Sequence, residues 1–328
     1  MINFKSITAY IKIIRPANTV MTGIAVALGV WLTGGVVIHT CPEAAYLARF
    51  SSPVNFPVYP GRTIAPWIAP IMLALAAMAA TAYGNVINDI RDIKSDRVSH
   101  PNRPLVDGTM TPRAAKIYAA DLAAASLACA WMASTFHLFA ATAPLILLTL
   151  YSIYFKRTRV VGNIVVSTLT AYAILFGALP RPEAKILILP AVLAFLLNFC
   201  RELVKDVQDA DGDRAAGWTT SADLRPGTIK ALIGNAAGAY ILLALAPSVI
   251  FGHFGMIYTI VCLTAVIPIH IYWSVLAFRN GIRENAGRIG ALLKLEMAAG
   301  LAALAGDFLY YAATPPLPIS YIILEIVS

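Results

Sequence analysis

The chain contains 328 residues, of which 59% are hydrophobic and only 13% are charged, and its mean hydropathy is +0.72. This composition excludes a soluble globular domain, in which about a quarter of the residues are usually charged. The formal net charge of +8 does not require a nucleic-acid partner, because basic cytoplasmic loops and contacts with anionic lipids account for it. We therefore expect an all-α membrane protein embedded in the lipid bilayer.

Apolar stretches of about 18 residues or more recur along the chain, and each is long enough to cross a bilayer as a helix. No polar linker separates them, so we expect a single domain over residues 1–328, a bundle of nine transmembrane helices. The expected spans are residues 17–36, 66–88, 114–135, 138–155, 160–179, 185–205, 229–250, 254–277 and 290–313. Residues 1–14 lack a cleavage site with small residues, which indicates a helix at the membrane interface and not a signal peptide. Residues 35–62 contain four prolines and predict an external loop.

The basic residues are distributed unevenly between the two sides of this expected bundle. Only Arg49, Arg62, Arg181 and Lys185 fall on one side, whereas the other 21 of the 25 Lys and Arg residues fall on the opposite side. Those 21 lie in or next to residues 1–16, 89–113, 156–159, 201–230 and 278–294. Since Lys and Arg are enriched in cytoplasmic loops, we expect these segments and the N-terminus to be cytoplasmic.

Two polar clusters directly follow long apolar stretches, at the ends of the second and sixth expected spans. They lie in the sequences GNVINDIRDIKSD and RELVKDVQDADGD, whose aspartates make up seven of the 17 acidic residues. At about 100° per residue, Asn85, Asn88, Asp92 and Asp96 share one face of a helix, and Asp89 borders that face. The first cluster therefore presents several oxygen ligands toward a common point.

In the second cluster, Asp206, Asp209 and Asp213 form a stripe with the spacing i, i+3 and i+7, whereas Asp211 points elsewhere. A single such carboxylate would indicate only a solvated helix end. Two clusters, each on one face of its helix and both on the same side of the membrane, favour a functional site. Carboxylate and amide oxygens suit Mg²⁺, which fills its octahedral shell with water and substrate phosphate. We therefore predict a cytoplasmic-side active site that holds Mg²⁺ and a phosphorylated ligand.

Basic residues surround both clusters, and some of them serve only to retain loops in the cytoplasm. Lys156 is a better functional candidate, because it shares one cytoplasmic turn with Tyr151 and Asn163. Arg15 and Asn18 open the first span, where a polar Asn18 on an apolar helix is not readily explained by structure alone. The four cysteines show no CxxC or Cys/His spacing, so neither a zinc site nor a disulfide framework is expected.

Taken together, these residues resemble the UbiA-type intramembrane prenyltransferases over nearly the whole chain. The similarity lies in Arg15-Pro16-x-Asn18, Asn88-Asp89-x-x-Asp92-x-x-x-Asp96, Pro101-Asn102-Arg103-Pro104-Leu105, Gly108, Tyr151-Ser152, Lys156, Gly162-Asn163 and Asp209-x-x-x-Asp213. The sequence from Arg201 to Asp206, followed by Gly212 and Asp213, is most similar to that of digeranylgeranylglyceryl phosphate synthases. These enzymes attach a second isoprenoid chain to a glycerol phosphate ether lipid. Chlorophyll synthases, and less closely the aromatic prenyltransferases of quinone synthesis, remain alternatives.

The resemblance implies an enzyme that moves a polyprenyl group, geranylgeranyl by the closest similarity, from its diphosphate to a lipid acceptor, with Mg²⁺ as cofactor. The metal ligands that it implies are Asn88, Asp92, Asp96, Asp206, Asp209 and Asp213. Catalytic roles fall to Lys156, Arg97, Lys205 and Asn18. Substrate contacts fall to Asn85, Asp89, Arg15, Arg91, Tyr151, Arg157, Asn163 and Arg201. A membrane carrier is a distant alternative, because carriers place their sites near the membrane midplane, whereas both clusters here lie at helix ends.

Overall fold

The computed structural model describes residues 4–34 and 68–313, and every regular element in these residues is helical. The helices are α1 (Phe4–Ile13), α2 (Pro16–Gly34), α4 (Ile68–Ser99), α5 (Pro112–Ala133), α6 (Thr135–Ile153), α7 (Val161–Phe176), α8 (Ile188–Ala215), α9 (Pro226–Leu243), α10 (Ala246–Val249), α11 (Met256–Val261), α12 (Ile267–Arg279) and α13 (Ile282–Ala313). A π-helical turn, Cys262–Val266, joins α11 to α12. The predicted external loop, residues 35–62, lies outside the described residues.

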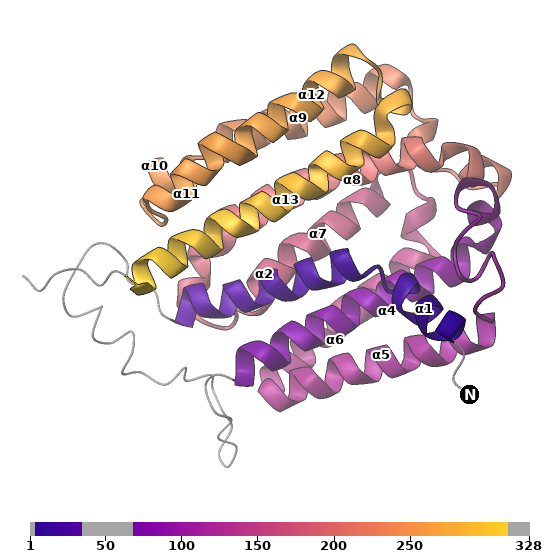
Figure 1. Cartoon of the computed structure of the whole chain (residues 1–328), viewed down its shortest axis with the longest axis horizontal. Coiled ribbons are helices and arrows are strands. Elements are labelled where there is room, and N and C mark those ends of the chain that lie inside the picture. Colours follow the sequence, from indigo (N-terminus) through magenta and orange to yellow (C-terminus); the bar gives the residue numbers. More distant parts are fainter. Residues whose placement is uncertain (1–3, 35–67, 314–328) are drawn as a thin grey trace, which may run out of the picture.

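The long helices run side by side across Figure 1, and the short α1 lies at one end of them. Within the described residues, each predicted span overlaps helical structure. In the described residues, seven helices are long and apolar enough to cross a membrane, and Val161–Phe176 is a shorter apolar helix. The chain is therefore an integral membrane protein, while nine crossings stay a prediction.

Helix α4 and helix α8 continue past the ends of their predicted membrane spans, residues 88 and 205, to Ser99 and Ala215, so both acidic clusters lie on helices as their spacing predicts. At 1.5 Å per residue, the 32 residues of α4 span about 48 Å. The hydrocarbon core of a bilayer is only about 30 Å thick. The last turns of α4 therefore leave the apolar layer, and these turns carry the first acidic cluster. The 28 residues of α8 bring the second cluster out of the apolar layer in the same way.

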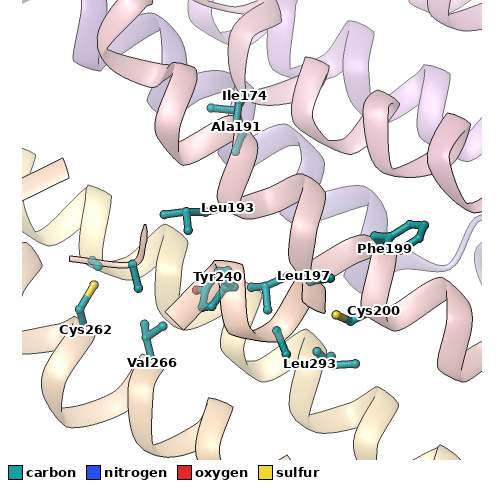
Figure 2. Close-up of a cluster of buried hydrophobic side chains, with 14 of the residues drawn as sticks. Ile174, Ala191, Leu193, Leu197, Phe199, Cys200, Tyr240, Cys262, Val266 and Leu293 are labelled. Atoms are coloured by element: carbon teal, nitrogen blue, oxygen red, sulfur yellow. The ribbon is translucent and has the colours of Figure 1, made fainter. Parts of the chain in front are cut away.

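The apolar faces of the helices pack into a core that contains residues from every part of the described chain. The largest cluster joins α2, α7, α8, α9, α12 and α13 and includes Leu203, Ile233 and Leu293, none of which is exposed. Figure 2 shows part of it, with Leu197 and Cys200 of α8 near Tyr240 of α9 and Leu293 of α13. This packing fixes α8 against the second half of the chain, while α4 packs on α2, α5 and α8.

Candidate active site

A cavity of about 290 Å³ opens between α2, α4, α6, α7, α8 and α13. Its charged lining residues and most of its amide side chains gather at the end of the bundle that carries the acidic clusters, here called the aspartate end. The polar residues there include Arg15, Asn18, Asn85, Asn88, Tyr151, Arg201, Glu202, Lys205 and Lys294. The remainder of its lining is mostly aliphatic and aromatic, down to Tyr258 and Cys262. The lining follows α8 from Lys205 to Pro190, which is about 22 Å at 1.5 Å per residue. A cavity with one charged end and a long apolar body suits a lipid-like ligand with an anionic head.

Helices α4 and α8 touch at the aspartate end, and this contact brings the two acidic clusters together. Ser95 Oγ donates a hydrogen bond of 2.7 Å to Asp213 Oδ1, and the hydroxyl of Ser99 donates to the backbone carbonyl of Asp209 at 3.4 Å. Gly212 permits this approach, because an added Cβ would lie only 2.6 Å from the backbone oxygen of Ser95. Clusters that are more than 100 residues apart in sequence therefore form one polar region.

The carboxylates of the first cluster are held by basic side chains. Asp89 is buried and accepts from the guanidinium groups of Arg15 at 2.6 Å and Arg103 at 3.2 Å. Arg103 also contacts the buried Asp96 at 2.5 Å. The turn that follows α4 folds back over the helix end and places Arg103 between these two carboxylates. Burial of charges is tolerated here because each one has an opposite partner.

Asp92 is the central carboxylate of the first cluster. One of its oxygens accepts from the ammonium group of Lys156, which lies on the turn after α6. The other, Oδ1, is buried and has no hydrogen-bond partner among the described residues. Burial disfavours the charged form of Lys156, but the carboxylate of Asp92 outweighs this effect and raises the pKa of the lysine above its ordinary value. Lys156 therefore stays cationic beside Asp92, whose second oxygen is free to bind a ligand.

The second cluster is held mainly by neutral donors and by one histidine. Asp206 accepts from the amide of Asn163 at 2.9 Å and from the hydroxyl of Ser221 at 2.6 Å. Asp209 lies 2.9 Å from Nε2 of His100, on the turn after α4. In contrast, the side chain of Asp211 is 68% exposed and pairs with Arg283. The prediction that Asp211 points away from the stripe is thus confirmed.

The turn between α1 and α2 is strained, and the site holds it in place. Arg15 has a φ of +53°, a left-handed conformation that costs a non-glycine residue about 1–2 kcal/mol. The guanidinium of Arg15 reaches Asp89, and the amide of Asn85 donates to the carbonyl of Ile14 at 2.9 Å. The hydroxyl of Thr19 donates to the same carbonyl at 2.7 Å. Asn85 therefore anchors this turn as well as lining the cavity.

The structure separates the predicted site residues into three groups. Those that line the cavity are Arg15, Asn18, Asn85, Asn88, Tyr151, Arg201 and Lys205. Those that form the paired polar region beside it are Asp89, Asp92, Asp96, Lys156, Asn163, Asp206, Asp209 and Asp213. Arg91, Arg97 and Arg157 are instead exposed and line a second, separate surface pocket. This placement gives no support to the predicted roles of these three arginines in the main cavity.

Several residues at the site were missed as individual sequence candidates. Arg103 bridges two aspartates, His100 contacts a third, and Lys294 of α13 lines the polar end of the cavity. In the sequence, Arg103 is one of the basic residues near the first cluster and part of the Pro101–Leu105 motif, but neither feature assigns it to Asp89 and Asp96. Lys294 carried no local signal, because its place in the cavity depends on how α13 packs against α8.

The acidic side chains of the described residues do not form a metal site on their own. In residues 4–34 and 68–313, no three His, Cys, Asp or Glu side chains converge closely enough to hold a metal ion by themselves. The aspartates do not converge because they pair with basic side chains instead: Asp92 with Lys156 and Asp96 with Arg103. The donor set still fits a hard divalent cation, because the carboxylates of two helices meet and Asp92 Oδ1 is buried without a partner.

Paired aspartate clusters beside the charged end of an amphipathic cavity indicate a membrane protein with a binding site for a lipid-like anion. The model of the UbiA prenyltransferase family matches residues 56–288. The chain belongs to this family and is a prenyltransferase.

Curated relatives resemble the chain over most of its length. A digeranylgeranylglyceryl phosphate synthase of Methanopyrus kandleri is 31% identical over 304 residues, which cover 92% of this chain and 99% of the relative. The synthase of Methanothermobacter thermautotrophicus is 29% identical, with 88% and 92% covered. That of Methanoculleus marisnigri is 33% identical over 217 residues, with 66% and 67% covered.

Solved structures share the fold. One, described as giving insights into the biosynthesis of digeranylgeranylglyceryl phosphate synthase in membranes, aligns with a TM-score of 0.66 at 22% identity and covers 93% of this chain and 99% of its own. A UbiA homolog from Archaeoglobus fulgidus bound to GPP and Mg²⁺ aligns with a TM-score of 0.57 at 18% identity, with 90% and 99% covered.

Proposed function

We propose that this chain is an Mg²⁺-dependent prenyltransferase that moves a geranylgeranyl group from its diphosphate to geranylgeranylglyceryl phosphate. We place the active site and the N-terminus on the cytoplasmic side of a single-domain bundle with nine crossings. The observation that carries the proposal is the amphipathic cavity, whose charged end adjoins both aspartate clusters. The names of the curated relatives support this acceptor.

The proposed metal ligands are the carboxylates and the amide that face the polar region: Asn88, Asp92, Asp96, Asp206, Asp209 and Asp213. When bound, Mg²⁺ would supply Lewis-acid stabilisation of the departing diphosphate. The metal requirement is supported by the partnerless Oδ1 of Asp92 and by the Mg²⁺ in the structure of the Archaeoglobus homolog.

Basic side chains of the protein neutralise the remaining negative charge of the diphosphate. Lys156 stays cationic beside Asp92 and stabilises negative charge that develops on the leaving diphosphate. Lys205 lines the cavity next to the second cluster and acts in the same way. Asn18 lines the same polar end and orients the reacting head group through its amide.

The acceptor phosphate is held at the aspartate end of the cavity, where basic side chains outnumber acidic ones. Arg15, Arg201, Lys205 and Lys294 line this end, where Glu202 is the acidic residue that lines it with them. Arg15 pairs with Asp89, whereas Arg201 and Lys205 both contact Glu202, at 2.5 Å and 3.8 Å. Among the described residues, Lys294 is therefore the cation at this end of the cavity that pairs with no carboxylate. The apolar body of the cavity holds the prenyl chain and keeps water from the cationic allylic carbon.

The test uses purified protein in detergent with labelled geranylgeranyl diphosphate and Mg²⁺. Four acceptors are compared under one set of conditions: geranylgeranylglyceryl phosphate, its dephosphorylated alcohol, 4-hydroxybenzoate and chlorophyllide. We expect the phosphorylated ether lipid to be preferred, because a charge-assisted contact to its phosphate is lost in the alcohol. Preference for either ring acceptor would overturn the acceptor assignment. Absence of covalent product from all four would overturn the proposed reaction.

A further inference from the structure

A second pocket lies on the surface of the aspartate end, apart from the cavity of the proposed reaction. Its lining comes from three separate places in the chain: the last turns of α4, the turn after α6 and the segment after α8. The residues are Ile90, Arg91, Ile93, Lys94, Arg97, Arg157, Ala216, Gly217 and Trp218. All four charged members of this set are basic. We call it the basic pocket.

The positive charge of the basic pocket is not neutralised by the protein. Arg91, Lys94, Arg97 and Arg157 are all exposed, and none of them pairs with a carboxylate of the described residues. Other basic residues at this end behave differently, since Arg15 and Arg103 each pair with a buried aspartate. Helix α4 thus directs its carboxylates into the bundle and leaves its own cations on the opposite, outer face.

Trp218 gives the basic pocket a fixed wall. The guanidinium of Arg157 lies 4.7 Å from the centroid of the indole ring, and the ammonium of Lys156 lies 5.5 Å from it. Both separations are within the range of cation–π attraction. Arg157 is therefore held in place against the ring, which lowers the entropic cost of using it to bind an anion.

The depth of the basic pocket corresponds to the lipid head-group layer. About 20 residues of a helix cross the hydrocarbon core, which for the described part of α4 ends near Ile87. Residues 90–97 then lie roughly 4–15 Å further along the axis, within and just beyond the head-group region, which is about 5–8 Å thick on each side. Ile90 and Ile93 in the lining suit a position that borders the apolar layer.

We propose that the basic pocket binds the phosphate monoester head group of a membrane lipid. Four cations that converge from two elements match the double negative charge of such a phosphate, and basic pockets at this level of a membrane protein are suited to anionic head groups. Charges that only retain a loop in the cytoplasm need no convergence and no aromatic wall. The proposal concerns binding and is independent of the reaction assigned to the main cavity.

The test measures fluorescence polarisation of a labelled short-chain phosphatidic acid as it binds the purified full-length protein in detergent. The variant Arg91→Gln/Lys94→Gln/Arg97→Gln is compared with Arg113→Gln/Lys116→Gln/Lys230→Gln, which removes three exposed cations that do not line the basic pocket. We expect the first variant to bind roughly tenfold more weakly or worse and the second to bind like the unaltered protein. Equal loss in both variants would overturn the proposal, because it would reduce the site to diffuse surface charge.

Two competitors distinguish the sources of the phosphate. Unlabelled phosphatidic acid should displace the probe, whereas phosphatidylcholine should not, because its head group carries no net charge. Inorganic phosphate should compete only at much higher concentration, since it lacks the apolar part that Ile90 and Ile93 border. Displacement by inorganic phosphate at the same concentration as by the lipid would overturn the assignment to a lipid head group. Thermal unfolding of each variant, which should match the unaltered protein because the replaced side chains are exposed, ensures that lost binding is not lost folding.

Discussion

Gly212 is the point at which the two aspartate helices touch, and its replacement by alanine tests the proposed site. The new Cβ would lie 2.6 Å from the backbone oxygen of Ser95 and would also overlap the hydroxyl of Ser99. Contacts of a Cβ below 3.0 Å are essentially never observed. The hydroxyl can rotate away, but the backbone oxygen cannot, so α4 and α8 must separate by several tenths of an ångström.

The expected magnitudes for Gly212→Ala differ between stability and activity. Overpacking costs about 1–3 kcal/mol, and alanine recovers about 1 kcal/mol of helix propensity, so the free energy of unfolding falls by roughly 0–2 kcal/mol. The rate of prenyl transfer should fall further, by about ten- to a hundredfold. The reason is that misplacement of catalytic groups by about 1 Å can cost two orders of magnitude, and the hydrogen bond from Ser95 to Asp213 is disturbed at the same time.

The assay combines initial rates of prenyl transfer with the thermal unfolding midpoint in detergent. Gly287→Ala in α13 is the matched control, because its added Cβ meets no atom within 4 Å apart from the neighbouring backbone of its own helix. It should keep full activity and raise the midpoint slightly, since alanine is the better helix former. Gly212→Ser should be worse than Gly212→Ala. A Gly212→Ala protein with the unaltered rate and midpoint would refute the argument that this helix contact sets the geometry of the site.

Three further predictions follow from the same residues. Asp92→Asn should abolish turnover, because it changes a proposed metal ligand, and it should also lower the thermal unfolding midpoint, because Lys156 loses its ionic partner. Asp211→Asn should be mild in both respects, because that side chain is 68% exposed. Equal loss of activity in the two variants would show that the metal-binding face is assigned wrongly. Exhaustive removal of divalent metal with EDTA should stop the reaction, and added Mg²⁺ should restore it; full activity in the metal-free protein would contradict the mechanism. Glu296→Ala should lower the free energy of unfolding, measured by denaturant titration, by about 3 kcal/mol or more. The reason is that Glu296 is fully buried, accepts a hydrogen bond from Trp273 at 2.6 Å and contacts His270 at 2.8 Å. A loss below about 1 kcal/mol would show that this network contributes little.

Much of the fold and part of the site were predictable from local pattern. Apolar stretches of membrane length identify helices without any tertiary information, because the bilayer leaves backbone groups few other ways to be satisfied. The i, i+3, i+7 spacing of Asp206, Asp209 and Asp213 identifies a helical face, because residues at these spacings lie on the same side of a helix. The divergence of Asp211 followed from that spacing alone, and the structure confirms it.

Helix ends and partners across the bundle could not be predicted in this way. The sequence ends the second expected span near residue 88 and continues the helical spacing to Asp96, but it does not reveal that Lys156 and Arg103, from distant turns, pair with Asp92 and Asp96. The same tertiary packing placed Arg97 outside the main cavity and Lys294 inside it. Helical spacing separates the face of Arg97 from the face of Asp92 and Asp96, but it does not say which of the two faces turns into the bundle. Only the contact of α4 with α8 determines which face is the inner one.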